Sequence, residues 1–226
     1  MTGVFVTGTG TEVGKTVVAA AIARTLTGEG KRVAVFKPAV TGLDEGSEPD
    51  HALLRRASGS EQSDGEIAPY RYGPPMSPHL AAALAGEAIA PERLLEAAGT
   101  AADRADALVC EGVGGLLVPL AGDYLVRDLA ADLGLPLVVA ASPGLGTINH
   151  TLLTLEAARA AGLEVAMAVL TPWPEEPAAI ERSNRETIAT LSGVEVETLP
   201  RLDLSSPTTW PRLAPPPRRP ASSRRG

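Results

Sequence analysis

Residues 3–16 read GVFVTGTGTEVGKT, and this stretch decides the fold. An apolar run ends in a glycine-rich turn, Gly14, Lys15 and Thr16 follow, and an Ala/Val/Ile segment begins at once. A strand, a glycine-rich loop and a helix in this order form a phosphate-binding loop. The glycines let backbone N–H groups surround phosphates at the positive end of the helix. Lys15 adds charge beside the β- and γ-phosphates, and the Thr16 hydroxyl can bind Mg²⁺.

The loop is a variant of the usual P-loop, because Thr9 stands where that pattern has a glycine. Beyond it, short β-branched runs alternate with longer Ala- and Leu-rich segments. Aromatic residues make up only 3% of the 226 residues, so the core must be aliphatic, as in buried parallel strands. We therefore predict a P-loop NTPase-type α/β fold, a doubly wound and mainly parallel sheet with helices on both faces.

The expected elements fall within one domain, residues 1–210. The strands are predicted at Val4–Thr7, Arg32–Phe36, Ala107–Cys110, Leu137–Ala140, Val165–Leu170 and Val196–Leu199. The helices are predicted at Thr16–Leu26, Asp50–Ala57, His79–Ala85, Pro91–Arg104, Val126–Leu133, Ile148–Ala160 and Ala178–Leu191. Residues 42–49 and 61–76 are expected to be loops. Residues 211–226 hold five prolines and five arginines, which predicts a disordered tail.

Composition excludes several classes of function. The net charge of −7 argues against nucleic acid as a partner, and no apolar run is long enough to span a membrane. The single cysteine, Cys110, excludes an intramolecular disulfide and a multi-cysteine zinc site. No basic region precedes an apolar stretch at the N-terminus, so we expect no signal peptide and a soluble, cytoplasmic protein.

Charged residues at predicted strand ends are the candidate site residues. Lys37 is one of only three lysines, against seventeen arginines, and it ends the second strand, at the edge where open α/β sheets bind ligands. Glu111 ends an apolar strand before a glycine-rich turn, which is where P-loop enzymes hold a second magnesium-binding carboxylate. Asp50 opens a helix after a loop, so it can be a helix N-cap, a magnesium ligand or both.

Together these motifs resemble the dethiobiotin synthetase family. The resemblance rests on residues 6–16, 36–42, Asp50, 77–82, 111–120 and 144–156, which are spread over most of the range 3–156. It implies that 7,8-diaminononanoate, CO₂ and ATP give dethiobiotin, ADP and phosphate. In that family a carbamate forms on one amine and attacks the γ-phosphate, giving a carbamic–phosphoric anhydride. The second amine then closes the ring.

The resemblance also implies roles for individual residues. The catalytic residues would be Lys15 and Lys37. The nucleotide would be bound by Glu12, Val13, Gly14, Lys15, Thr16, Val17, Glu111, Thr171, Pro172, Pro200 and Leu202. The diamine and carbamate would be bordered by Thr11, Lys37, Thr41, Gly114, Gly115, Gly146, Thr147 and Asn149. Mg²⁺ would be held by Thr16, Asp50 and Glu111.

The helix that starts near Ile148 reaches the partner's substrate carboxylate in the family, so a homodimer with shared sites is implied. Whether the side chains of His79 and His150 take part stays open. So does the nucleotide base preference, because residues 170–174 lack the Asn that the family often has there.

Three other functions were weighed. A MinD/ParA-like nucleotide-switched ATPase that binds a partner shares this fold, but it carries an extra lysine early in the P-loop, and residues 9–13 contain none. A cobyrinate-type amidotransferase synthetase needs a glutaminase with a nucleophilic cysteine, for which this chain has neither the length nor a suitable cysteine. A relative that kept the fold and lost the activity is the third.

Overall fold

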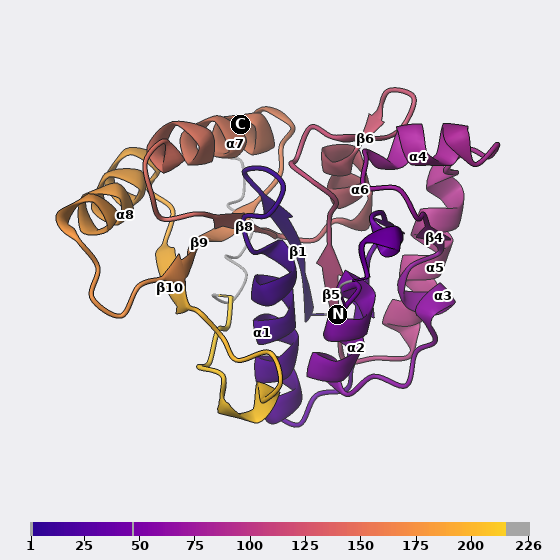
Figure 1. The fold of residues 1–226 in the computed structure, drawn as a ribbon, viewed down its shortest axis with the longest axis horizontal. Coiled ribbons are helices and arrows are strands. Elements are labelled where there is room, and N and C mark those ends of the chain that lie inside the picture. The colour runs from indigo at the N-terminus through magenta and orange to yellow at the C-terminus, as the bar shows by residue number, and fades with distance from the viewer. Residues whose placement is uncertain (1, 47, 216–226) are drawn as a thin grey trace, which may run out of the picture.

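The computed structural model describes residues 2–46 and 48–215. Its centre is a six-stranded sheet in the order β10-β9-β8-β1-β5-β2, and every pair of neighbouring strands is parallel (Figure 1). These strands are β1 (Thr2–Gly8), β2 (Val33–Phe36), β5 (Ala107–Glu111), β8 (Leu137–Ala141), β9 (Val165–Trp173) and β10 (Val196–Pro200). All six predicted strands and the doubly wound class are confirmed.

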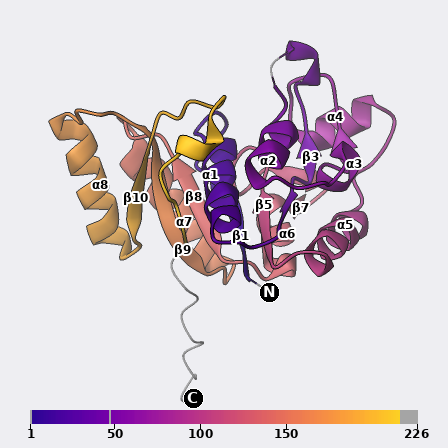
Figure 2. The ribbon, with the colours of Figure 1, turned by 90° about the horizontal axis from the view of Figure 1, so that it is seen from below.

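Helices cover both faces of the sheet (Figure 2). One face carries α1 (Lys15–Gly28) and α2 (Asp50–Ser58). The other face is covered by α4 (Pro78–Leu84), α5 (Pro91–Asp103), α6 (Val126–Leu133), α7 (Thr147–Ala160) and α8 (Ala179–Ser192). All seven predicted helices are present, with ends displaced by one or two residues at most. Since parallel strands share one carboxyl edge, the loops after β1, β2, β5 and β8 meet there.

Residues 61–76 are not only a loop, as we expected. They contain α3 (Asp64–Ile67) and β4 (Tyr70–Arg71), which pairs with β3 (Ala39–Val40). The helix is a single turn, too short to show apolar periodicity, and it forms because Ser63 and Glu66 make a capping box. A second small sheet pairs β6 (Pro119–Ala121) with β7 (Tyr124–Leu125), and 3₁₀ turns lie at Leu43–Glu45 and Pro207–Thr209.

Helix α1 is buried on nearly every side. Its residues 18–23 are all at most 1% exposed, because the sheet lies on one side of the helix and chain segments lie on the others. One of these segments is residues 202–213, called here the C-terminal strap. Leu202, Leu204, Trp210 and Leu213 of the strap join the same apolar cluster as α1. Residues 211–213, which we predicted to be disordered, belong to the strap, because Leu213 is buried against α1. The rest of the predicted tail from residue 216 lies outside the described residues.

In the described ranges, no helix combines the length and the apolar character needed to cross a bilayer.

Candidate active site

The P-loop joins β1 to α1 at the carboxyl edge of the sheet. Its path depends on close packing: a Cβ on Gly8 would lie 2.6 Å from Val13 Cγ2 and 2.9 Å from Lys15 Cγ. Gly14 has a φ of 87°, and Glu12 has a φ of 59°, which is rare for a residue other than glycine. The loop is also tied to β8, since the Thr9 N–H donates to the Ala140 carbonyl at 3.0 Å.

Lys15 is folded back on its own loop. Lys15 is only 7% exposed, and its Nζ donates a hydrogen bond to the Gly10 carbonyl at 2.8 Å. Burial lowers the pKa of Lys15, although the nearby Glu111 carboxylate opposes that effect. The ammonium group therefore lies where incoming phosphate oxygens could replace the Gly10 carbonyl as its partner.

Glu111 lies at the centre of a polar cluster that joins four segments of the chain. Its Oε1 accepts hydrogen bonds from Thr16 Oγ1 and from Lys37 Nζ, each at 2.8 Å. Asp50 contacts the same two donors: its Oδ1 accepts from Thr16 at 3.0 Å, and its Oδ2 lies 2.8 Å from Lys37 Nζ. The structure thus brings together Thr16, Lys37, Asp50 and Glu111, which the sequence analysis selected separately.

Burial and charge act against each other in this cluster. Burial by itself lowers the pKa of Lys37, but the Glu111 and Asp50 carboxylates outweigh it and raise that pKa overall. The pKa of Glu111 is raised, chiefly because the group is fully buried. For Asp50, burial raises the pKa, but the Lys37 ammonium, the Thr16 hydroxyl and the Lys15 ammonium together outweigh burial and lower that pKa overall. Lys37 is therefore charged at neutral pH although it is only 2% exposed.

The donor set fits a magnesium ion. In the part of the chain that the structure describes, no three His, Cys, Asp or Glu side chains are grouped as a metal site. Thr16, Asp50 and Glu111 instead supply one hydroxyl and two carboxylates, and Glu111 Oε2 is buried without a hydrogen-bond partner. Mg²⁺ prefers such hard oxygen ligands and commonly takes only one or two carboxylates, with phosphate oxygens and water completing its shell.

The glycine-rich turn after β5 lies directly against the P-loop. A Cβ on Gly115 would be 3.6 Å from the Gly8 carbonyl and 3.9 Å from Gly10. Gly114, with a φ of 62°, is part of the same turn. Of the other predicted substrate contacts, Thr11 is exposed in the P-loop, and Thr41 is half-buried just after β3.

The residues expected to bind the nucleotide base come together beside the start of α1. A Cβ on Gly14 would lie 2.5 Å from Thr171 Cγ2, so Thr171 packs against the P-loop itself. Pro172 follows Thr171 on β9, and Pro200 at the end of β10 pairs with Trp173. Leu202 begins the C-terminal strap and belongs to the same apolar cluster as the P-loop residue Val13 and the helix residue Val17.

Among the described residues, the start of α7 forms no hydrogen bond or ion pair with the cluster around Glu111 in its own chain. Gly146 is the N-cap and is exposed, Thr147 is buried against Thr151, and Asn149 is exposed in the first turn. The adjacent Leu145 is 93% exposed. Both His79 and His150 are exposed.

Two residues of the site were missed by the sequence analysis. Gly8 is not among the residues selected from the sequence, but its missing side chain makes room for Lys15 and Val13. Gly10 supplies the carbonyl that holds the Lys15 ammonium. The sequence signal for Gly8 is a glycine directly after the predicted first strand. A side chain at that position would collide with the loop.

Comparisons with known proteins agree with this architecture. A family model described as an AAA domain matches residues 2–209. The ATP-dependent dethiobiotin synthetase BioD of Rhodococcus erythropolis is 45% identical over 192 residues, which is 84% of this chain and 84% of that protein. BioD of Anaeromyxobacter dehalogenans is 48% identical over 75% of this chain and 76% of its own length. BioD of Bacillus subtilis is 37% identical over 87% and 85%.

Among solved structures, the MinC:MinD cell division protein complex of Aquifex aeolicus matches with a TM-score of 0.60 at 13% identity. The match covers 90% of this chain and 83% of that one. A ParA family ATPase from Chlorobium tepidum matches with a TM-score of 0.55, also at 13% identity, over 90% and 88%. At such identity the likeness is one of fold alone, so the MinD/ParA-like alternative gains no support. The chain belongs to the family of ATP-dependent dethiobiotin synthetases, which are ligases of biotin synthesis.

Proposed function

We propose that this chain converts 7,8-diaminononanoate, CO₂ and ATP into dethiobiotin, ADP and phosphate. The proposal rests on one observation: Lys37 and Thr16 both contact Glu111 and Asp50. Thr16 directly follows Lys15, the lysine of the P-loop. A carbamate that approaches a triphosphate is an anion meeting an anion. A site for that reaction needs fixed positive charge where the two meet, and this arrangement offers it.

In the first step an amine of the substrate bonds to the carbon of CO₂ and loses a proton, which gives a carbamate. Lys37 is suited to hold the carbamate oxygens, because its ammonium is a compact point charge on a rigid strand end. Thr11, Thr41 and the turn that holds Gly114 and Gly115 are proposed to border the substrate. No general base is required, since the amine can lose its proton to water or phosphate.

In the second step a carbamate oxygen attacks the γ-phosphorus, and the bond from that phosphorus to the bridging oxygen of ADP breaks. Lys15 would leave the Gly10 carbonyl and neutralise charge on the β- and γ-phosphates. Thr16, Asp50 and Glu111 would hold a magnesium ion, which supplies further charge neutralisation when bound. The second amine then attacks the carbonyl carbon, loses its proton and expels phosphate as the ring closes.

The base of the nucleotide is proposed to lie against Thr171, Pro172, Pro200 and Leu202. These residues flank the P-loop at its β9 and β10 side, where Thr171 packs against Gly14. Glu12, Val13, Gly14 and Val17 would contact the phosphates and sugar from the loop and the first helical turn. An ATP-dependent reaction also makes the cytoplasm the proposed location.

A homodimer is proposed to complete each site. Leu145, Leu153 and Leu117 are 93%, 55% and 52% exposed, and all three belong to the α7 region or to the turn after β5. Large apolar side chains exposed together favour a protein interface. A second copy that covers them would bring Gly146, Thr147 and Asn149 to the partner's substrate carboxylate, which a helix N-terminus can bind.

The test is phosphate release from ATP, magnesium and bicarbonate, with and without 7,8-diaminononanoate, while dethiobiotin is followed by mass spectrometry. The proposal expects release that depends on the diamine, equals the dethiobiotin formed, and stops when EDTA removes magnesium. Phosphate release that ignores the diamine, without product, would contradict it and favour a nucleotide-switched ATPase. Replacing ATP by CTP or GTP in the same assay measures the base preference.

A further inference from the structure

The outer edge of β2 is covered by one side chain. Among the strands of residues 2–46 and 48–215, β2 lies at the edge of the sheet and pairs only with β5, so the backbone groups of Val35 point away from the sheet. The Val35 N–H donates to Gln62 Oε1 at 2.9 Å, and Gln62 Nε2 donates to the Val35 carbonyl at 3.1 Å. A primary amide offers a donor and an acceptor side by side, as a peptide group does. Gln62 thus takes the place of a neighbouring strand.

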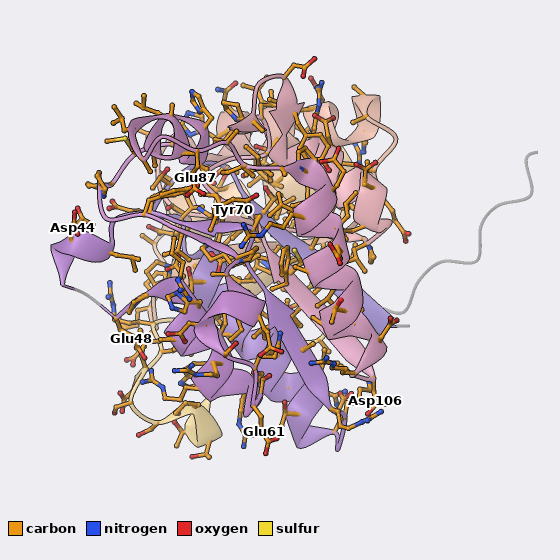
Figure 3. The ribbon with its side chains drawn as sticks, turned by 90° about the vertical axis from the view of Figure 1, so that its right-hand side faces the viewer. Asp44, Glu48, Glu61, Tyr70, Glu87 and Asp106 are labelled. Carbon is orange, nitrogen blue, oxygen red and sulfur yellow. The ribbon has the colours of Figure 1, made fainter. Side chains whose placement is uncertain are left out.

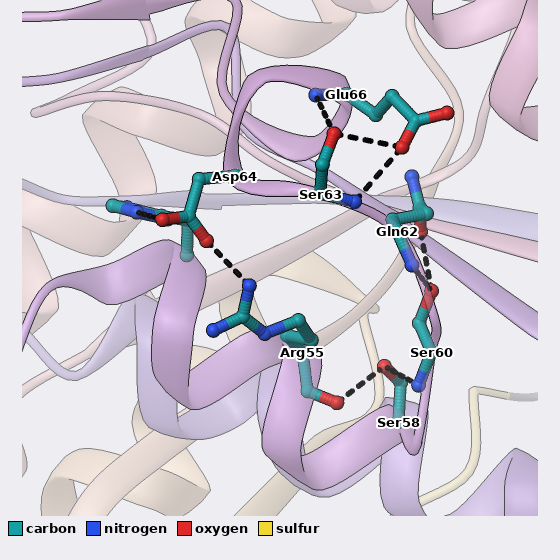
Figure 4. A network of polar contacts seen from close by, with 8 residues as sticks. Arg55, Ser58, Ser60, Gln62, Ser63, Asp64 and Glu66 are labelled. Atoms are coloured by element: carbon teal, nitrogen blue, oxygen red, sulfur yellow. Dashed lines mark hydrogen bonds and ion pairs between the residues drawn. The ribbon is translucent and has the colours of Figure 1, made fainter.

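Gln62 is held in turn by a chain of polar contacts from α2 (Figure 4). Ser60 Oγ donates to Gln62 Oε1 at 2.9 Å, and the Ser60 N–H donates to Ser58 Oγ at 3.2 Å. Ser58 Oγ donates to the carbonyl of Arg55, whose guanidinium group pairs with Asp64 of α3 at 2.5 Å. These contacts fix the orientation of the Gln62 amide relative to both helices.

The same segment is bound to the site at its two ends. It begins with Asp50, whose carboxylate lies 2.8 Å from Lys37 Nζ. It ends at α3, where the Ile67 carbonyl accepts a hydrogen bond from the Lys37 N–H at 2.8 Å. Gln62 therefore holds the backbone of Val35, two residues before Lys37, and the Ile67 carbonyl holds the backbone of Lys37 itself.

A cavity of about 870 Å³ borders the N-terminal part of this edge. It is lined by Val33, Ala34 and Gln62 among others, and includes no P-loop residue. Figure 3 shows Glu61, which precedes Gln62, and Asp106, which directly precedes β5, in the lower part of the view. Asp106 lies near the N-terminal end of β2, because Val33 pairs with Ala107. The side chains of β2 are buried and the strand pairs with β5. Along the free edge, the two hydrogen bonds of Gln62 are the contacts made at Val35.

We propose that Gln62 is a positioning residue, which sets the place of Lys37 relative to Asp50 and Glu111 by closing the free edge of β2. The proposal rests on the proposed function, because it assumes that Lys37 serves the reaction. Gln62 touches no substrate, so its effect is exerted through the strand.

The variant Gln62→Met keeps the length of the side chain and removes its donor and acceptor. We expect kcat for dethiobiotin formation to fall about tenfold, since misplacing a reacting group by about 1 Å can cost up to ~100-fold. The KM for ATP should change by less than about twofold, because the P-loop itself is untouched. The Val35 amide should exchange with solvent about tenfold faster, as expected for one lost hydrogen bond.

Two control variants separate positioning from general stability. Thr27→Val removes the hydrogen bond that Thr27 of α1 donates to the carbonyl of Ser58, the last residue of α2, at 2.9 Å. Glu61→Gln changes the exposed neighbour of Gln62. Both should keep kcat within about twofold of the parent chain, even where Thr27→Val melts at a lower temperature.

Unchanged exchange of the Val35 amide in Gln62→Met would overturn the proposal, and this measurement needs no turnover. An equal loss of kcat in Thr27→Val would also overturn it, because the effect would then follow stability. If the parent chain forms no dethiobiotin, the proposed function fails, and amide exchange still decides whether Gln62 holds the edge.

Discussion

Lys37 keeps its charge in a place where an isolated lysine could not. The residue is 2% exposed, and two carboxylates 2.8 Å away make the buried ammonium stable. The stabilisation is mutual, because the Glu111 carboxylate is fully buried and Lys37 is the cation that lies nearest to it. Removing one member of a buried ion pair costs about 3–5 kcal/mol, since the other charge is left without a partner.

The variants Lys15→Ala and Lys37→Ala should each lower kcat/KM by about 100-fold or more. Each removes charge that faces the negative charge developing during phosphoryl transfer. Lys15→Ala should also weaken ATP binding, whereas Lys37→Ala should mainly lower kcat and the melting temperature. Steady-state kinetics with ATP and diamine varied separately, and thermal melts, measure these effects.

Lys31→Ala is the matched control, because Lys31 is the one other lysine and pairs with Glu29 at the surface. Its activity should stay within about twofold of the parent. Turnover near that of the parent chain in either of the first two variants would refute the assignment of the site.

At the scale of elements, the turn between α5 and β5 is attached to the start of β2 by one carboxylate. Both the Arg32 side chain and the Arg32 N–H donate hydrogen bonds to the Asp106 carboxylate. These bonds, chiefly those of the side chain, lower the pKa of Asp106 to about 2. A carboxyl group with a lowered folded-state pKa stabilises the protein above its unfolded pKa, near 4. That contribution is lost as the pH falls from about 4 to about 2.

Asp106→Asn should therefore lower the melting temperature at pH 6 and have less effect near pH 2. The fall should be small, because the pair is exposed and screened by solvent. Melting curves of the parent, Asp106→Asn and the exposed neighbour variant Asp103→Asn at both pH values provide the test. An effect of Asp106→Asn that is equally large at both pH values would contradict this linkage.

The C-terminal strap depends on Leu213. This side chain is 4% exposed in the cluster around α1, and its N–H donates to Thr25 Oγ1 at 2.9 Å. Leu213→Ala should cost about 2–4 kcal/mol, because it removes buried methyl groups and leaves a cavity. For a chain of this length that corresponds to a fall of roughly 5–15 °C in Tm. Thermal or urea unfolding measures the loss, with the exposed Leu191→Ala as the control.

At the scale of the whole molecule, the proposed shared site can be tested by mixing two inactive chains. Lys37→Ala damages the site of its own chain, and Asn149→Ala would damage the site of its partner. In a mixed dimer one site then carries both defects and the other carries none. Random mixing should restore about a quarter of the parent activity, since half of the dimers are mixed and each has one intact site.

Each variant alone must be nearly inactive, and the mixture must be refolded or exchanged together before the dethiobiotin assay. No recovery after proven subunit exchange would argue that each chain builds its site alone. A companion variant, Leu145→Asp, should shift the sedimentation of the protein towards the monomer if that leucine is covered by the partner.

The sequence by itself determined the class of the fold, the six central strands, seven of the helices and the position of the P-loop between the first strand and the first helix. It could do so because a P-loop combines a strand, a turn and a helix within 14 neighbouring residues, where local geometry dictates the residue types. It could not predict α3, since one turn held by a capping box leaves no periodic pattern.

Only the tertiary structure decided which charges meet. Thr16, Lys37, Asp50 and Glu111 lie up to 95 residues apart, and parallel pairing brings them to one edge. It alone also placed Leu213 on α1 and the Gln62 amide on β2. Both depend on surfaces that exist only after distant segments have packed, so neither burial nor an open strand edge can be read from neighbouring residues.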